Sequence, residues 1–185
     1  MKILALSGSL RAASINTMLL RVMAQVAPRD IQVSVYDGLG KLPLFNADLE
    51  SRYPAPVLEF HRAVAAADAL VFASPEYAHG VTGTIKNALD WLVGFEPFAA
   101  KFVAVLNTSP RAHHADDALR ETLKTMAAVV VEPASISIPL LGAGLDESAM
   151  AATPAIAAAV LECLRCLQHA VVSTSGSVTA EFPLG

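Results

Sequence analysis

Short apolar runs alternate with amphipathic segments of helical length along the chain. The apolar runs predict five strands, at residues 2–6, 31–36, 69–73, 102–106 and within 129–138. Apolar side chains that recur every three or four residues predict five helices, at residues 16–27, 57–67, 82–93, 114–127 and 154–170. Strands that alternate with helices in this way are typical of a parallel sheet covered on both faces. The hydrophobic pattern therefore predicts an α/β protein with a three-layer, doubly wound, five-stranded parallel sheet.

Proline, glycine and polar residues cluster between these elements and mark the loops. Residues 37–55 and 139–151 are predicted to be loops, and Pro133 can divide the last strand. We expect one domain over residues 1–172 and a flexible C-terminal tail over residues 173–185. In doubly wound sheets, ligands bind at the carboxyl ends of the strands beside the switch in strand order. Functional residues are therefore expected in the loops after the first, third and fourth strands.

Composition and charge exclude several classes of protein. Of the 185 residues, 54% are hydrophobic and 16% are charged, so the chain can bury one sizeable core and is not intrinsically disordered. A net charge of −4 without a run of basic residues excludes a nucleic acid or a membrane surface as an electrostatic partner. No apolar stretch of about 18 residues is uninterrupted, so we expect no membrane span. The N-terminal apolar run is too short for a signal peptide, and we expect a cytoplasmic protein.

The loop after the first strand combines hydroxyl groups with one guanidinium, Arg11. Residues 7–17 read SGSLRAASINT and lead into a helix, whose N-terminus adds free backbone N–H groups. This combination suits a phosphate monoester, whereas neither a Walker loop nor a GxGxxG fingerprint is present. A polar loop in which Ser14 or Asn16 only caps the helix is the alternative. Arg11 favours the phosphate site, because a helix cap needs no guanidinium.

The loop after the third strand, residues 74–83, combines turn residues with an aromatic ring. Pro75 restricts the backbone, and we expect Gly80 and Gly83 to allow tight turns. Tyr77 offers a flat surface for an aromatic ligand. The neighbouring Glu76 is alternatively a general acid or base.

Other polar and sulfur-bearing residues have structural interpretations. Lys86, Asn87, Asp90 and Trp91 of the next helix are expected to be structural or at a subunit interface, with Trp91 in the core or the interface. His79 is expected to be a surface or structural histidine. Cys163 and Cys166 have CxxC spacing but lie inside a helix, whereas the thioredoxin motif opens one. We therefore expect both cysteines to be structural.

Two motifs together resemble the NADPH-dependent FMN reductase family. They are GSLRAAS-N after the first strand and SPEY…G…KNALDW after the third, and the similarity runs from residue 1 to about 125, including LPLFNADLE at 42–50. The resemblance implies a flavodoxin-like fold with strand order 2-1-3-4-5, bound FMN, and NADPH or NADH as reductant. It also implies electron transfer in a ping-pong cycle to small acceptors such as quinones or free flavin. A homodimer or homotetramer with the flavin near the subunit interface is implied as well.

The same resemblance assigns roles to individual residues. The side chains that it implies for binding the FMN phosphate are Ser9, Arg11, Ser14, Asn16 and Thr17. The residues that it implies along the isoalloxazine ring are Pro75, Glu76 and Tyr77. No residue is assigned to catalysis, because the flavin carries the redox chemistry.

The loop after the fourth strand departs from the family pattern. This loop, residues 107–117, is shorter than in the family and carries His113 and His114 where the family has small residues. In the loop after the third strand, Ala78 replaces a frequent asparagine. One interpretation is that Ser109, Arg111 and the histidines contact flavin or the 2′-phosphate of NADPH. The others are a metal site formed by His113, His114 and Asp117, and a helix start with polar caps.

Two other functions compete with the reductase hypothesis. A flavodoxin-like electron carrier would bind FMN without direct turnover of NAD(P)H, but such carriers tend to be more acidic than this chain. A serine hydrolase would use Ser7 or Ser9, but the chain has no GxSxG motif.

Overall fold

Five parallel strands form the central sheet of the protein, in the order β2-β1-β3-β6-β7. The computed structural model describes residues 1–109 and 111–177. The strands of this sheet are β1 (Lys2–Ser7), β2 (Gln32–Tyr36), β3 (Ala69–Ala73), β6 (Phe102–Leu106) and β7 (Val129–Val130). Because β4 (Glu76–Tyr77) and β5 (Gly80–Val81) form a separate hairpin, this order equals the predicted order 2-1-3-4-5. The predicted flavodoxin-like sheet is confirmed.

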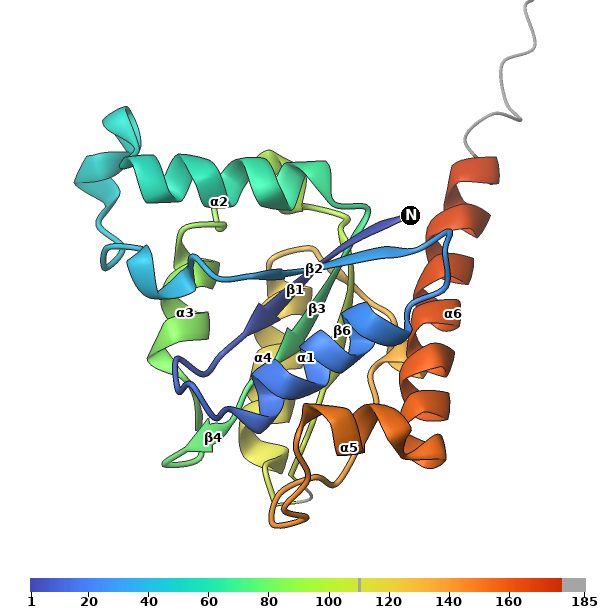
Figure 1. The fold of residues 1–185 in the computed structure, drawn as a ribbon. Coiled ribbons are helices and arrows are strands. Elements are labelled where there is room, and N and C mark those ends of the chain that lie inside the picture. Colours follow the sequence, from blue (N-terminus) through green and yellow to red (C-terminus); the bar gives the residue numbers. More distant parts are fainter. Residues whose placement is uncertain (110, 178–185) are drawn as a thin grey trace, which may run out of the picture.

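Helices cover both faces of this sheet (Figure 1). One face packs against α1 (Ile15–Val26), α5 (Glu147–Ala152) and α6 (Pro154–Ser177). The other face packs against α2 (Ala55–Ala66), α3 (Gly83–Asp90) and α4 (His113–Thr125). Short 3-10 helices lie between these elements, namely η1 (Leu39–Lys41), η2 (Ala47–Arg52), η3 (Glu96–Phe98) and η4 (Glu132–Ala134). The predicted three layers are therefore present.

The central strand β3 shows why the sheet requires continuous apolar runs. All five of its residues are buried, and successive side chains point to opposite faces. Leu70 and Phe72 pack in the core with α2, α3 and α4, whereas Val71 packs in the core with α1 and α6. A strand buried on both faces has no position for a polar side chain, which explains the sequence ALVFA.

The structure differs from the sequence prediction near the C-terminus. The predicted loop 139–151 contains α5, which Asp146 caps by accepting a hydrogen bond at 2.8 Å from the backbone N–H of Ala149. A helix of six residues is too short to show a clear hydrophobic period. Helix α6 continues to Ser177, past the predicted helix end at residue 170, and includes the first five residues of the predicted tail. The rest of that predicted tail, residues 178–185, lies outside the described residues.

The fifth strand is shorter than its predicted segment. It comprises only Val129–Val130, and Pro133 lies in η4, which begins after one intervening residue. The chain returns to the sheet edge at a parallel bridge between Asn107 and Ser137. Pro133 thus divides the strand as predicted, because proline lacks the N–H that the ladder requires.

Helix α6 has the length and apolar composition of a membrane span over Pro154–Thr174. Its inner face, however, contributes Val160, Cys163, Leu164 and Leu167 to the core beside the sheet, and all four are fully buried. The apolar character of these positions is therefore explained by packing against α1 and β6.

Candidate functional site

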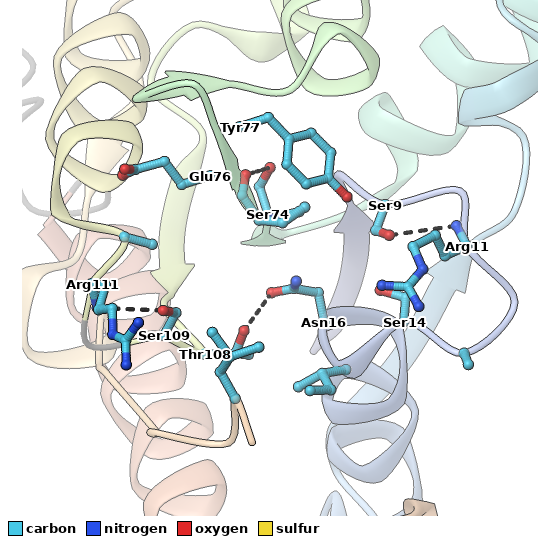
Figure 2. A pocket seen from close by; sticks show the side chains of 15 residues that line it. Ser9, Arg11, Ser14, Asn16, Ser74, Glu76, Tyr77, Thr108, Ser109 and Arg111 are labelled. Carbon is cyan, nitrogen blue, oxygen red and sulfur yellow. Dashed lines mark hydrogen bonds between the residues drawn. The ribbon is translucent and has the colours of Figure 1, made fainter. Parts of the chain in front are cut away.

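A cavity of about 460 Å³ opens at the carboxyl ends of β1, β3 and β6. Three loops contribute to its wall, and Figure 2 shows their side chains pointing into a shared space. The lining residues are Ser9, Arg11, Ala13, Ser14, Ile15, Asn16, Ser74, Pro75, Glu76, Tyr77, Thr108, Ser109, Arg111, Ala112 and Leu141. Nine of the ten residues selected from the sequence are among them, and Thr17 is the exception. The cavity lies where a doubly wound sheet binds its ligand.

Gly8 allows the first two loops to meet. Its backbone N–H donates to the carbonyl oxygen of Ala73 at 2.8 Å, which continues the pairing of β1 with β3. A Cβ atom at this position would lie 2.8 Å from Cγ1 of Ile85 and even closer to Oγ of Ser74. Only glycine therefore fits between these two strand ends.

The first loop forms the end of the cavity that suits an anion. Ser14 is the N-cap of α1 and accepts a hydrogen bond at Oγ from the backbone N–H of Thr17, at 3.3 Å. Ser9 accepts at Oγ from the backbone N–H of Arg11, at 3.4 Å, and the Arg11 side chain is exposed. No ion pair of the Arg11 guanidinium occurs within residues 1–109 and 111–177. A helix N-terminus beside a guanidinium free of carboxylates is well suited to a phosphate group.

Asn16 and Thr17 have different orientations from one another. Asn16 is buried and accepts a hydrogen bond at Oδ1 from Oγ1 of Thr108, at 3.1 Å, which joins the first loop to the third. Thr17 shares a hydrogen bond of 2.7 Å with Oγ of Ser7 and lines a neighbouring cavity of about 290 Å³. Its hydroxyl therefore supports the loop from the side away from the main cavity.

A hairpin of β4 and β5 carries Tyr77 at the edge of the cavity. Ala78 and His79 at its tip have φ angles of 50° and 60°, a conformation that side-chain-bearing residues adopt rarely. The prediction that Gly80 and Gly83 make the turn is wrong, because neither has a positive φ. The Tyr77 side chain is 57% exposed, and Figure 2 shows its hydroxyl directed toward Ser9.

Glu76 connects this hairpin to α4. Its Oε2 accepts a hydrogen bond of 2.8 Å from the backbone N–H of Ala115 in the first turn of α4. The N-cap residue of that helix, Ala112, has no side chain that could make such a bond. The carboxylate therefore replaces the missing cap, and this contact favours a structural role for Glu76 over acid–base catalysis.

The third loop is shaped by Asn107, which the sequence analysis did not select. Its Nδ2 donates to the carbonyl oxygen of Ala112 at 3.0 Å, and its Oδ1 accepts from the backbone N–H of Ser109 at 2.9 Å. Asn107 and Thr108 directly follow a buried strand, and that position was the available signal. Arg111 follows this turn and lies across the cavity from Arg11 (Figure 2).

Three histidine rings lie against one another beside the third loop. The ring centroids of His79 and His114 are 4.3 Å apart, and those of His113 and His114 are 4.1 Å apart. Throughout the described ranges, no group of three or more His, Cys, Asp or Glu side chains is arranged to hold a metal ion. The metal hypothesis for His113, His114 and Asp117 therefore has no geometric support.

The residues outside the cavity have the structural roles that the sequence suggested. Trp91 is buried, and its Nε1 donates to the carbonyl oxygen of Pro43 at 2.8 Å. Asn87 donates at 3.0 Å to the same oxygen, and Lys86 pairs with Asp90 on the helix surface. Burial raises the pKa of the Cys163 thiol to about 12, as expected of a structural cysteine.

The donor set of the cavity fits a flavin mononucleotide. The Arg11 end supplies a guanidinium, hydroxyls and helical N–H groups for one phosphate. The remaining wall supplies a tyrosine ring, a proline and loop backbone, which suit a flat heteroaromatic ring. The serine hydrolase hypothesis receives no support, because the Ser7 hydroxyl bonds to Thr17 and to the carbonyl oxygen of Ser9 rather than to a histidine.

Comparisons with known proteins agree with this geometry. The NADPH-dependent FMN reductase family matches residues 1–140. An NAD(P)H-dependent FMN reductase of Pseudomonas aeruginosa is 38% identical over 111 residues, which cover 58% of this chain and 60% of that protein. A quinone reductase of Escherichia coli K12 is 34% identical over 113 residues, which cover 59% and 60%. The match thus spans about three fifths of these curated relatives.

A solved structure extends the similarity over more of the fold. The flavoenzyme NAD(P)H:(acceptor) oxidoreductase FerB of Paracoccus denitrificans superposes with a TM-score of 0.65 and 30% sequence identity. The superposition covers 75% of this chain and 76% of that one.

Proposed function

The chain belongs to the NADPH-dependent FMN reductase family, and from this premise we propose that it is an FMN-dependent NAD(P)H oxidoreductase. Its acceptors would be quinones, free flavin or related small molecules. The matched residues 1–140 contain all three loops of the cavity, although not Leu141. Similarity to reductases therefore includes the part of the molecule where the chemistry would occur.

The observation that carries this proposal is that the anion-binding groups of the cavity lie together at one of its ends. Arg11, Ser9, Ser14 and the N-terminus of α1 lie together at one end, where they would hold the FMN phosphate. When bound there, FMN supplies hydride and electron transfer chemistry that protein side chains lack. Pro75 and Tyr77 on one loop, and Thr108 and Ser109 on another, would orient the ring.

The chain itself would position the ring and control access to it. Two hydrogen bonds connect the loops in pairs and restrain their relative positions. One joins Thr108 to Asn16, and the other joins Ala115 to Glu76. The exposed Tyr77 leaves the edge of the cavity accessible from solvent. An accessible site of this kind suits a ping-pong cycle, in which reductant and acceptor bind one after the other.

An anaerobic absorption experiment tests the proposal. Purified protein mixed with FMN and freed of excess cofactor is expected to show flavin bands, which NADPH bleaches within seconds. A quinone added afterwards should restore the bands. Failure to retain FMN would refute the FMN site, and retention without bleaching by NADPH or NADH would favour the electron carrier instead. The relatives named above are reductases, which favours the enzyme.

We further propose that two copies of the chain associate through an apolar surface beside the site. Leu44 and Val93 are 83% and 69% exposed, and the partly exposed Phe45 and Leu49 lie in the same loop region. Hydrogen bonds from Asn87 and Trp91 to Pro43 hold this loop in place. A rigid exposed apolar surface favours a protein partner, and a second copy is the partner that the family resemblance implies.

The phosphate-binding loop adjoins this surface. A methyl group of Leu10, which follows Ser9 in that loop, lies 3.2 Å from where a Cβ atom of Gly40 would be. A homodimer formed here would place the flavin near the subunit interface, and a homotetramer would need a second surface. We also propose a cytoplasmic location, which the two free cysteines support.

A further inference from the structure

Four basic or hydrogen-bonding side chains lie in or beside the cavity but away from its phosphate-binding end, namely Arg111, His79, His113 and His114. We propose that they bind the 2′-phosphate of NADPH and thereby make the enzyme prefer NADPH over NADH. This inference rests on the proposed function and assigns the residues that select the reductant.

The four side chains come from two neighbouring segments, the third loop with the start of α4 and the hairpin tip. Arg111 and Ala112 line the cavity, and His113 and His114 follow them as the first residues of α4. His79 comes from the hairpin tip, and its ring stacks on that of His114 at 4.3 Å. The hydrogen bond from Ala115 to Glu76 keeps the hairpin next to the first turn of α4. The cluster is therefore continuous with the Tyr77 side of the cavity.

Apart from their ring contacts, these side chains have no polar partner in the part of the chain that the structure describes. Within residues 1–109 and 111–177, neither the Arg111 guanidinium nor any of the three imidazoles makes a hydrogen bond or ion pair. Two carboxylates of the adjoining segments have partners of their own, since Glu76 accepts from Ala115, and Oδ2 of Asp116 pairs with Arg120 at 2.7 Å. Asp117, exposed on α4, is the acidic group left in this region. The nitrogen donors are thus available to an external anion.

The requirements of FMN leave this cluster unused. FMN carries one phosphate, which the Arg11 end of the cavity satisfies. Arg111 lies at the other end, as Figure 2 shows, and would be too remote to share that phosphate. A second anionic group is therefore needed to explain a second guanidinium, and NADPH differs from NADH by one such group.

The chemistry of the cluster matches a phosphate monoester. A guanidinium binds phosphate oxygens through two parallel N–H donors, and a neutral imidazole can donate one more hydrogen bond. In a chain with a net charge of −4, such a cluster is not a consequence of overall composition.

Steady-state kinetics of the FMN-loaded protein test the assignment. Arg111→Ala is expected to lower kcat/KM for NADPH by about tenfold, the usual effect of losing a charged hydrogen bond, and to change kcat/KM for NADH less than twofold. Arg29→Ala, which removes an exposed arginine from the turn before β2, is the matched control and should change neither. An equal loss with both reductants would overturn the inference, because it would place Arg111 at the flavin or the nicotinamide.

The histidines need variants that separate hydrogen bonding from packing. His113→Phe and His114→Phe keep a ring for stacking but remove the N–H donors, so the double variant should lose NADPH preference while keeping its melting temperature. Unchanged preference in this variant would exclude the two histidines as ligands.

A binding measurement provides a readout besides turnover. Titration calorimetry of the FMN-loaded protein should show adenosine 2′-monophosphate binding about tenfold more weakly to Arg111→Ala than to the unaltered protein. Adenosine without phosphate should show no such difference. Suppose that the protein retains FMN and oxidises NAD(P)H, while Arg111→Ala changes neither the ratio of kcat/KM for NADPH and NADH nor the affinity for adenosine 2′-monophosphate. In that case only this inference is wrong. If NADPH and NADH both fail to bleach the flavin, the proposed function fails and the inference with it.

Discussion

The carboxylate of Glu76 caps α4 by accepting a hydrogen bond of 2.8 Å from the backbone N–H of Ala115. The two residues are 39 positions apart, and they join the hairpin after β3 to the helix after β6. Since both segments border the cavity, this contact restrains two walls of the site relative to each other.

Replacing Glu76 should therefore destabilise the protein. Glu76→Ala is expected to lower the free energy of unfolding by about 1 kcal/mol, the usual effect of losing an N-cap, and Glu76→Gln by less because its amide oxygen can still accept. Urea denaturation monitored by circular dichroism measures both. Unchanged stability together with an altered pH profile of activity would instead indicate an acid–base role.

Arg11→Ala should weaken FMN binding without affecting the fold. Loss of a charged hydrogen bond to phosphate is expected to raise the Kd for FMN by about tenfold or more. The exposed side chain of Arg11 makes no ion pair with the described residues, so the melting temperature of the apoprotein should stay the same. Flavin fluorescence titration measures the Kd, and an unchanged value would mean that the phosphate binds elsewhere.

Gly8→Ala should disrupt the site by separating the two strand ends. The added methyl would overlap Ser74 and Ile85, and overpacking of this kind costs about 1–3 kcal/mol. Gly83→Ala is the matched control, because a Cβ there meets no atom within 4 Å. We expect a lower melting temperature and weaker FMN binding only for Gly8→Ala. Equal effects of both substitutions would contradict the packing argument.

Leu44→Glu should weaken self-association if the apolar surface beside the site is the dimer interface. A charge at a fully covered apolar position is unfavourable, so sedimentation should detect monomer at concentrations where the unaltered protein is dimeric. Val172→Glu places the same charge at an exposed position of α6 and should leave the assembly unchanged. If Val172→Glu were monomeric and Leu44→Glu were dimeric, the interface would lie on α6 instead.

The two thiols should differ in reactivity. Burial raises the pKa of the Cys163 thiol to about 12, so at pH 8 it remains protonated and inaccessible. Burial and the neighbouring Glu162 also raise the pKa of Cys166, but that residue is partly exposed. A disulfide reagent should modify one thiol of the native protein and two after denaturation. The native reaction should become faster as pH rises, because the thiolate fraction increases. Cys166→Ser should abolish the native reaction.

The sequence predicted the strands most accurately where burial is continuous. Residues 69–73 and 102–106 are strands with the predicted boundaries, because each is apolar along its whole length. Helix α5 was missed because six residues carry too little periodicity. The turn of the hairpin was misplaced because φ angles of 50° and 60° at Ala78 and His79 contradict the local preference for glycine.

The sequence predicted which residues form the candidate site, but not the hydrogen bonds that hold its loops in place. Nine of the ten selected residues line one cavity, since parallel strands bring their carboxyl ends to the same edge of the sheet. Thr17 lies outside it, because the helical period directs its side chain to Ser7. Asn107 and Thr108 were overlooked, because Asn107 acts through hydrogen bonds within its own loop and Thr108 through one to Asn16 of the first loop.

The sequence by itself determined the positions of the buried strands, the positions of the three loops and the chemical character of the phosphate-binding end. These depend on local periodicity and on residue types that act within a few positions of each other. Only the tertiary structure decided that Glu76 caps α4, that Asn16 bonds to Thr108, and that His79 stacks on His114. These partners are 35 to 92 positions apart, and such contacts depend on how the loops pack once the sheet has formed.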